Sequence, residues 1–91
     1  MSEQRREVMI VNKRGLHARA SAKFVACVAA MNDCQVTVSK DGNSAAGGSI
    51  LGLMMLGAAK GDRIELTVSG EAAEQRLAEL VAMIEDGFGE D

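Results

Sequence analysis

Two stretches of the chain, residues 35–40 and 62–68, alternate between apolar and polar residues, and this alternation restricts the possible folds more than any other feature. A third stretch, residues 7–11, reads as a strand with Val8 and Ile10 on one face and Met9 on the other. Successive side chains of a β-strand point to opposite faces, so alternation predicts strands that bury one face and expose the other. The side chains expected to face the core are those of Val8, Ile10, Val36, Val38, Ile64, Leu66 and Val68. Strands with one polar face are typical of an antiparallel sheet that is covered on one side only.

A fourth strand is predicted by a turn. Asp41-Gly42 directly follows residues 35–40. This pair of residues favours a two-residue hairpin between antiparallel strands, because both accept the backbone angles that the turn requires. We therefore expect a short partner strand over residues 43–46.

Three helices complete the predicted fold. Residues 18–31 set Phe24, Val25, Val28 and Met31 at helical spacing, and residues 71–86 do the same for Ala73, Leu77, Leu80, Val81 and Ile84. A shorter helix over residues 50–56 would begin at Ser49 as its N-cap and end at Gly57. The predicted order is β-α-β-β-α-β-α. This order gives an open-faced α+β sandwich, with the helices gathered on one side of an antiparallel sheet.

Length and composition restrict the class of protein. Ninety-one residues without proline, repeat or linker predict a single domain over residues 1–91. A net charge of −3 and the lack of a basic stripe argue against nucleic-acid binding. We expect a cytoplasmic protein without a membrane part, because no apolar run could cross a bilayer and residues 1–6 lack the apolar stretch of a secretory signal. Cys27 and Cys34 are then expected to be buried thiols rather than a disulfide.

His17, the only histidine, is the candidate functional residue. Gly15 favours a bend before it and the following residues are helical in character, so His17 is expected at the first turn of a helix. There, unpaired N–H groups and the helix dipole favour an anion and disfavour a positive charge on the imidazole. Arg19 offers a planar guanidinium that suits phosphate oxygens. This combination predicts a histidine that carries a phosphoryl group, although a histidine beside a glycine can also be a surface or capping residue.

Other readings of His17 remain open on the residues alone. A single histidine excludes a multi-histidine metal site, and we expect neither a metal nor another cofactor. A hydrolase would need a second catalytic group, and the neighbouring sequence offers only Lys13, Arg14 and Arg19. A pure interaction module would use the apolar helix and leave the histidine without a role.

The helix predicted over residues 50–56 has six apolar residues in seven positions, whereas a helix on a sheet buries one stripe. If Leu53 and Leu56 point inward, Leu51 and Met54 must lean toward solvent, with Ile50 at the border. Adjacent exposed apolar residues indicate a surface that binds partner proteins, unless neighbouring loops cover the helix. Phosphorylation of Ser49 would place negative charge beside this surface.

These motifs resemble HPr, the histidine phosphocarrier family of the bacterial phosphotransferase system. The resemblance is carried by residues 15–19 (GLHAR), 23–25 (KFV), 49–54 (SILGLM) and Gly57, and it extends over about residues 7–88. It implies an open-faced sandwich with strand order 1-4-2-3. It also implies that His17 accepts a phosphoryl group on Nδ1 from phosphorylated enzyme I and passes it to a IIA protein, while Arg19 helps to hold that group.

The resemblance implies further roles. Ser49 matches the serine that an HPr kinase phosphorylates in many bacteria. The shared docking surface would comprise Ala18, Arg19, Ala22, Lys23, Ile50, Leu51 and Met54. A relay carrier of this kind is not an enzyme and works as a monomer.

The sequence also departs from the family pattern. Ala20 stands where the family usually has proline, and alanine is a strong helix former. Gly48 replaces a basic residue of many relatives, which weakens the case for kinase recognition of Ser49. The end of the chain, residues 88–91, is similar to proteobacterial forms, including the nitrogen-related branch NPr, which has a regulatory role. The residues therefore leave the sugar-transport and nitrogen branches open.

Overall fold

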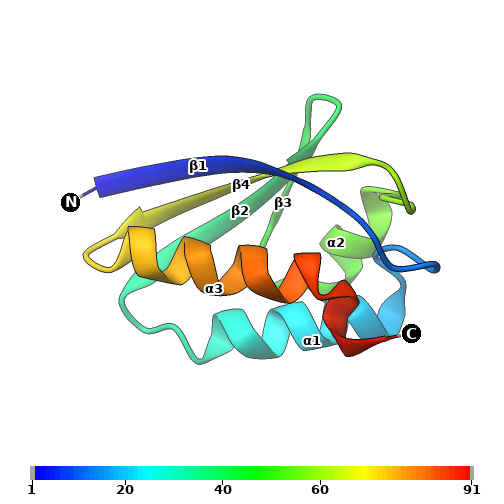
Figure 1. The fold of residues 1–91 in the computed structure, drawn as a ribbon. Coiled ribbons are helices and arrows are strands. Elements are labelled where there is room, and N and C mark those ends of the chain that lie inside the picture. The colour runs from blue at the N-terminus through cyan, green and yellow to red at the C-terminus, as the bar shows by residue number, and fades with distance from the viewer. Residues whose placement is uncertain (1, 91) are drawn as a thin grey trace.

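A four-stranded antiparallel sheet and three helices make up the fold, seen in a computed structural model that describes residues 2–90 (Figure 1). Met1 and Asp91 of the predicted domain lie outside the described residues. The elements are β1 (Ser2–Met9), α1 (Ala18–Ala29), β2 (Cys34–Lys40), β3 (Asn43–Ala46), α2 (Ile50–Met55), β4 (Arg63–Gly70), α3 (Ala73–Glu85) and a 3₁₀ turn, η1 (Gly87–Gly89). The predicted order of strands and helices is confirmed.

The strands are arranged β1-β4-β2-β3, and every neighbouring pair is antiparallel. The register brings the predicted inward residues together, as in the pairs Val8–Ile64 and Val36–Val68. All seven side chains predicted to face the core are buried. The opposite face carries polar residues such as Thr37, which pairs with Thr67. The sheet therefore has one apolar and one polar face, as the alternation predicts.

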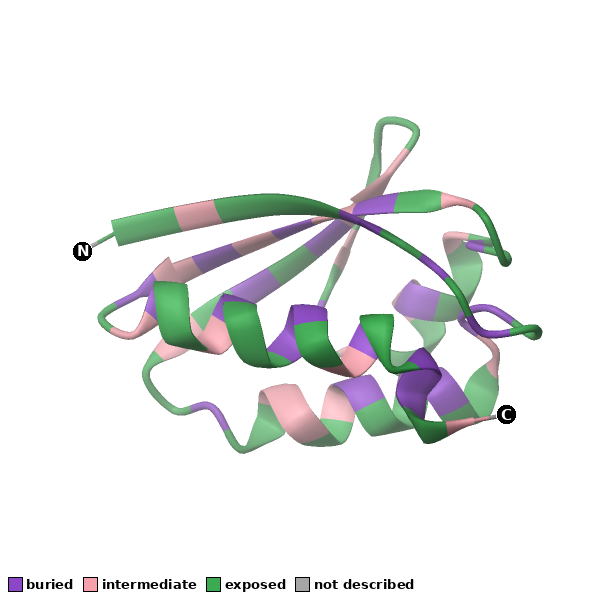
Figure 2. Cartoon of the chain, viewed as in Figure 1, coloured by how far each residue is buried: buried purple, intermediate pink, exposed green. Residues whose placement is uncertain are grey.

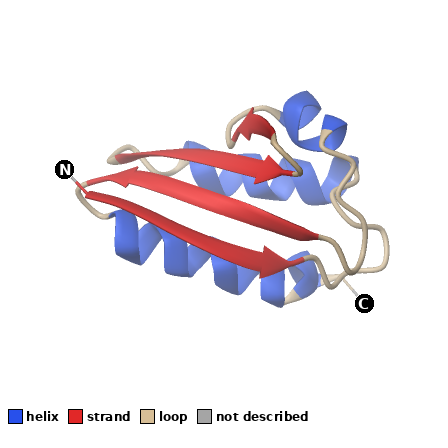
Figure 3. Ribbon diagram, turned by 90° about the horizontal axis from the view of Figure 1, so that it is seen from above, coloured by secondary structure: helices blue, strands red, loops and turns tan. Residues whose placement is uncertain are grey.

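The helices lie on the apolar face of the sheet (Figures 2 and 3). Helix α3 packs on β1 and β4, and α1 contacts both α2 and α3. The stripe predicted for α3, from Ala73 to Ile84, is buried. In α1, Phe24 is buried whereas Val25 and Val28 are half-buried. Within residues 2–90, no helix has the length and apolar character needed to span a bilayer.

The predicted two-residue turn joins β2 and β3. Asp41 and Gly42 both have positive φ, +50° and +84°, and Lys40 pairs with Asn43. Positive φ at both central residues is the signature of the turn that matches the twist of paired strands. The hairpin therefore forms where the sequence predicts it.

Several predicted boundaries were wrong. Strand β1 begins at Ser2 rather than residue 7, because its polar first half pairs with β4 in a register that starts at Ser2–Gly70. The predicted strand extended to Val11, but β1 ends at Met9 and Val11 is 42% exposed. Helix α1 ends at Ala29, although Met31 beyond it is still buried.

Cys27 and Cys34 are free thiols, and they are half-buried rather than fully buried as predicted. Desolvation raises the pKa of both thiols above the ordinary cysteine value, with nearby acidic groups adding to the shift. A thiol with a raised pKa is poorly ionised and a weak nucleophile at neutral pH. We therefore expect neither cysteine to act as a nucleophile at neutral pH.

Candidate functional site

His17 is the N-cap residue of α1, where the chain leaves an irregular loop and enters the helix. Two residues earlier, Gly15 has a φ of +63°, and Leu16 N–H donates to Ala58 O at 2.9 Å. A Cβ on Gly15 would lie 2.3 Å from that same oxygen. The bend is therefore pinned against the loop after α2 at a point that has no room for a side chain. This confirms the predicted position of His17 at the start of a helix.

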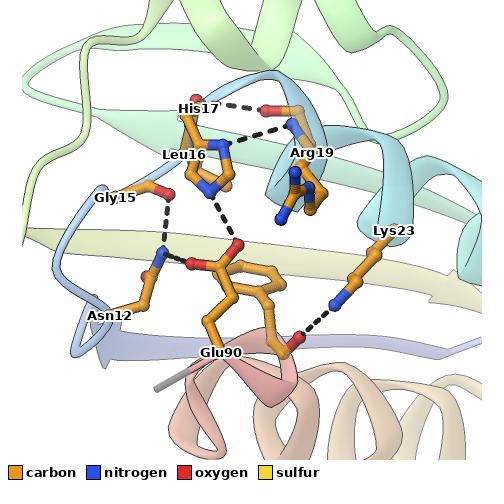
Figure 4. A network of polar contacts seen from close by, with 9 residues as sticks. Asn12, Gly15, Leu16, His17, Arg19, Lys23 and Glu90 are labelled. Carbon is orange, nitrogen blue, oxygen red and sulfur yellow. Dashed lines mark hydrogen bonds and ion pairs between the residues drawn. The ribbon is translucent and has the colours of Figure 1, made fainter.

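Both ring nitrogens of His17 have partners (Figure 4). Nδ1 accepts from the backbone N–H of Arg19 at 3.3 Å, and Nε2 lies 2.6 Å from Oε2 of Glu90. A carboxylate can only accept, and Nδ1 needs a lone pair to face an N–H donor. Together the two contacts select the form of the ring with its proton on Nε2. Nδ1 then carries the available lone pair, and its bond to Arg19 is long.

Glu90 is the member of the site that the sequence analysis missed. Its Oε1 accepts from Nδ2 of Asn12 at 3.0 Å, and the same Nδ2 donates to Gly15 O at 2.8 Å. The hydrogen bond from Asn12 is the main cause of a lowered pKa of the Glu90 carboxyl, and the hydrogen bond and charge of His17 act in the same direction. The sequence next to His17 offers only Lys13, Arg14 and Arg19 as polar partners, and the structure adds Glu90 from the other end of the chain. No local pattern indicates this contact, because 73 positions separate Glu90 from His17.

The turn η1 brings Glu90 to the site. Gly87, Phe88 and Gly89 all have positive φ, which reverses the chain after α3. Phe88 is buried, and Nζ of Lys23 donates to Phe88 O at 2.7 Å. The end of the chain is therefore held against α1 by one apolar side chain and by hydrogen bonds.

Cationic side chains surround the start of α1. A hollow of about 350 Å³ is lined by Lys13, Arg14, Arg19, Lys23, Gly89 and Glu90. Four of these residues are positively charged, and Glu90 supplies the one carboxylate. Arg19 is exposed, and its guanidinium lies on the same side of the helix start as the His17 ring (Figure 4). This arrangement favours a doubly charged anion such as a phosphoryl group.

Helix α2 presents the apolar surface that its composition predicts. Leu53 is fully buried, whereas Leu51 and Met54 are 68% and 40% exposed. Ile50, placed at the border by the sequence analysis, is 41% exposed, and Met55, not singled out from the sequence, is 76% exposed. Neighbouring loops therefore do not cover this helix.

The other predicted docking residues lie on the adjacent helix. Ala18, Ala22 and Lys23 are exposed on α1, which packs beside α2. The exposed residues of the two helices thus belong to neighbouring elements. Their role in docking remains a prediction.

Ser49 caps α2 as predicted. Its Oγ accepts from Gly52 N–H at 3.0 Å. Ser49 directly precedes the exposed residues Ile50 and Leu51 in the chain, and it is half-exposed. The structural role of Ser49 is thus confirmed, whereas its phosphorylation remains a prediction.

A family model describing the phosphorylation site of the HPr component of the phosphotransferase system matches residues 4–86. The chain belongs to the HPr family. An HPr relative from Pseudomonas aeruginosa, named phosphocarrier protein HPr, is 46% identical over 85 residues and is aligned over 92% of this chain and 93% of its own. Phosphocarrier protein NPr of Escherichia coli is 38% identical, with 92% and 93% covered. The crystal structure of an HPr from Thermoanaerobacter tengcongensis is 37% identical and superposes with a TM-score of 0.88, covering 100% of this chain and 99% of that one.

HPr membership confirms the resemblance drawn from the sequence motifs. It supports a phosphocarrier role in the phosphotransferase system. HPr proteins are carriers rather than catalysts, which fits a site with one histidine at a partly open surface. Both an HPr and an NPr relative match nearly the whole chain, at 46% and 38% identity, so family membership leaves the branch open.

Proposed function

We propose that this chain accepts a phosphoryl group on Nδ1 of His17 from phosphorylated enzyme I and passes it to a IIA protein. The proposal rests on one observation. The carboxylate of Glu90 lies 2.6 Å from Nε2 and accepts its proton in a hydrogen bond, which leaves the lone pair on Nδ1 at the start of a helix. The helix terminus and the cations around it favour the charge of the transferred group.

The proposed transfer forms one bond as it breaks another. The Nδ1 lone pair bonds to phosphorus while the bond between phosphorus and the donor atom of enzyme I breaks. Because the ring keeps its Nε2 proton, it gains positive charge, and the Glu90 carboxylate balances that charge at 2.6 Å. The Arg19 N–H, now facing Nδ1 at 3.3 Å, becomes free to donate to a phosphoryl oxygen. Transfer to the IIA acceptor reverses these steps.

The proposed partners dock on the exposed faces of α1 and α2. The residues proposed for this shared surface are Ala18, Arg19, Ala22, Lys23, Ile50, Leu51 and Met54. Apolar side chains beside cations suit partners with an apolar patch and an acidic rim. In this proposal, residues 1–91 form a single-domain, monomeric, cytoplasmic carrier, and an HPr kinase regulates it by phosphorylating Ser49.

A second candidate is the nitrogen-related branch, in which the same chemistry serves regulation without sugar uptake. The NPr relative, 38% identical over 85 residues, supports this alternative. Both branches use the same site, and they differ in the IIA protein that receives the phosphoryl group.

One assay tests the proposal. The protein is incubated with enzyme I and phosphoenolpyruvate, and its intact mass and the released inorganic phosphate are measured. A single acid-labile phosphoryl group that is absent from His17→Ala is the expected result. Steady release of inorganic phosphate would indicate a hydrolase instead, and no modification would indicate an interaction module. Addition of a sugar-specific or a nitrogen-related IIA protein then shows which branch the carrier serves.

A further inference from the structure

We propose that Asn12 is a positioning residue that acts through Glu90 to hold the proton of His17 on Nε2. This inference rests on the proposed function for its effect on phosphotransfer, but not for its effect on the ring itself. Asn12 is only 4% exposed, and apart from Ser21 it is the one polar residue fully buried among the described part of the chain.

The amide of Asn12 can take only one orientation. Nδ2 donates both to Gly15 O at 2.8 Å and to Glu90 Oε1 at 3.0 Å. The reverse orientation would place Oδ1 against two acceptor oxygens, without a proton between them. Both donors of the amide are thus used, one on the loop that precedes His17 and one on the carboxylate that contacts it.

Glu90 divides its two oxygens between Asn12 and His17. Oε1 accepts from Asn12 at 3.0 Å, whereas Oε2 lies 2.6 Å from Nε2 of His17 (Figure 4). Fixing one oxygen of a planar carboxylate also fixes the position of the other. Asn12 can therefore act on His17 through this carboxylate, as an orienting residue acts on a functional imidazole. We call these contacts, from Asn12 through Glu90 to His17, the relay.

Asn12 also leaves one of its own atoms unsatisfied. Its Oδ1 is buried and has no hydrogen-bond partner in the structure. A buried acceptor without a partner lowers stability, so such an atom in a folded protein needs a reason. Here the reason is the NH₂ group on the same amide, which the relay requires. An apolar side chain at this position would avoid the unsatisfied oxygen but would release Glu90.

Two substitutions break the relay at different points. Asn12→Asp keeps the size of the side chain but replaces both donors by a carboxylate that faces another carboxylate. Glu90→Ala removes the middle of the relay from a turn at the end of the chain. Asn32→Ala, which removes an exposed amide between α1 and β2, is the matched control.

The experiment measures which ring nitrogen of His17 carries the proton in the unphosphorylated protein, by ¹⁵N and ¹H NMR. We expect the wild type and Asn32→Ala to show a slowly exchanging Nε2–H proton, and Asn12→Asp and Glu90→Ala to lose it. The initial rate of phosphorylation by enzyme I should fall about tenfold or more in Asn12→Asp and in Glu90→Ala, because removing the orienting partner of a metal-bound histidine typically costs about 10–100-fold in activity. In the Glu90→Ala background, Asn12→Asp should cause no further loss.

Additive effects in the double variant, or a retained Nε2–H proton in Asn12→Asp, would overturn the proposal. If the Asn12 variant does not fold, Glu90→Ala decides alone, because a retained proton there removes the relay. Failure of His17 to accept phosphate would refute the proposed function and leave the NMR result standing. The two proposals therefore fail separately.

Discussion

The carboxylate of Glu90 lies 2.6 Å from Nε2 of His17, across 73 positions of sequence. The candidate site is therefore built from both halves of the chain: the start of α1 supplies His17, and the turn after α3 supplies its partner. The cations that line the adjoining hollow come from the loop before α1 and from α1 itself.

Glu90 should hold the terminal turn only while it is ionised. Its pKa lies below the ordinary value, first because Asn12 donates to it. A carboxyl whose pKa falls on folding stabilises the fold above its unfolded pKa and loses that contribution as the pH falls through the folded value. We therefore expect η1 to loosen below about pH 4, near the ordinary glutamate pKa.

Amide exchange at Gly89, whose N–H donates to Asp86 O, measures this loosening. Glu90→Gln should show faster exchange already at neutral pH and little further change in acid. A wild-type turn that stays equally protected from neutral pH down to about pH 3 would contradict the assignment.

Arg19→Ala should slow phosphorylation by enzyme I about tenfold or more, because a hydrogen bond to a charged group contributes about 1.5–3 kcal/mol. Arg19→Lys should recover only part of the rate, since an ammonium lacks the planar fork. Arg19 is exposed, so the melting temperature should stay unchanged. Lys60→Ala, another exposed cation, serves as the control. Equal rates in Arg19→Ala and the control would exclude a role for the guanidinium.

Leu51 and Leu53 form a matched pair on α2, 68% and 0% exposed. Leu53→Ala should lower the free energy of unfolding by about 2–5 kcal/mol, as for other buried leucines. Leu51→Ala should change it by less than about 0.5 kcal/mol and yet weaken the complexes with enzyme I and IIA. Chemical denaturation and calorimetric titration measure the two effects. Unchanged affinity in Leu51→Ala would remove this residue from the docking surface.

Two substitutions of Ser49 distinguish its capping role from its proposed regulatory role. Ser49→Ala should cost about 1 kcal/mol, because Gly52 N–H loses its acceptor. Ser49→Asp should keep the cap, since aspartate is an equally good N-cap residue, but it adds negative charge beside Ile50 and Leu51. Ser49→Asp should therefore melt at a higher temperature than Ser49→Ala. In contrast, Ser49→Ala should bind the partners more tightly than Ser49→Asp. An aspartate variant that binds enzyme I and IIA as tightly as the wild type would argue against regulation at this position.

Gly15→Ala should destabilise the bend before His17. Its φ of +63° disfavours a side chain, and the added Cβ would meet Ala58 O at 2.3 Å. A strained residue of this kind costs about 1–3 kcal/mol, and the clash adds to that cost. Gly48→Ala, where a Cβ meets nothing within 4 Å, is the control and should stay within about 0.5 kcal/mol of the wild type. Similar unfolding midpoints for both variants would show that the bend tolerates a side chain.

Short-range patterns were enough to predict most of the fold. Alternation in residues 62–68, the Asp41-Gly42 turn and the Ser49 cap each depend on neighbouring residues, and the structure confirms all three. The site at His17 was predictable for the same reason, because the bend at Gly15 and the start of α1 are local features.

The features that were missed depend on partners far along the chain. The first half of β1 is polar and becomes a strand only through its pairing with β4. Glu90 reaches His17 only because α3 and η1 carry it there, and nothing in its neighbouring residues requires that position. Met55 is exposed because the buried stripe of α2 is centred on Leu53.

The two ends of the described chain lie at opposite ends of the molecule, with Glu90 at the site and Ser2 at the far end of β1 (Figure 1). Purification handles and fluorescent fusions should therefore be appended ahead of Ser2. The same additions behind Glu90 would crowd the imidazole, and a weak carrier prepared that way would reflect the label rather than the protein.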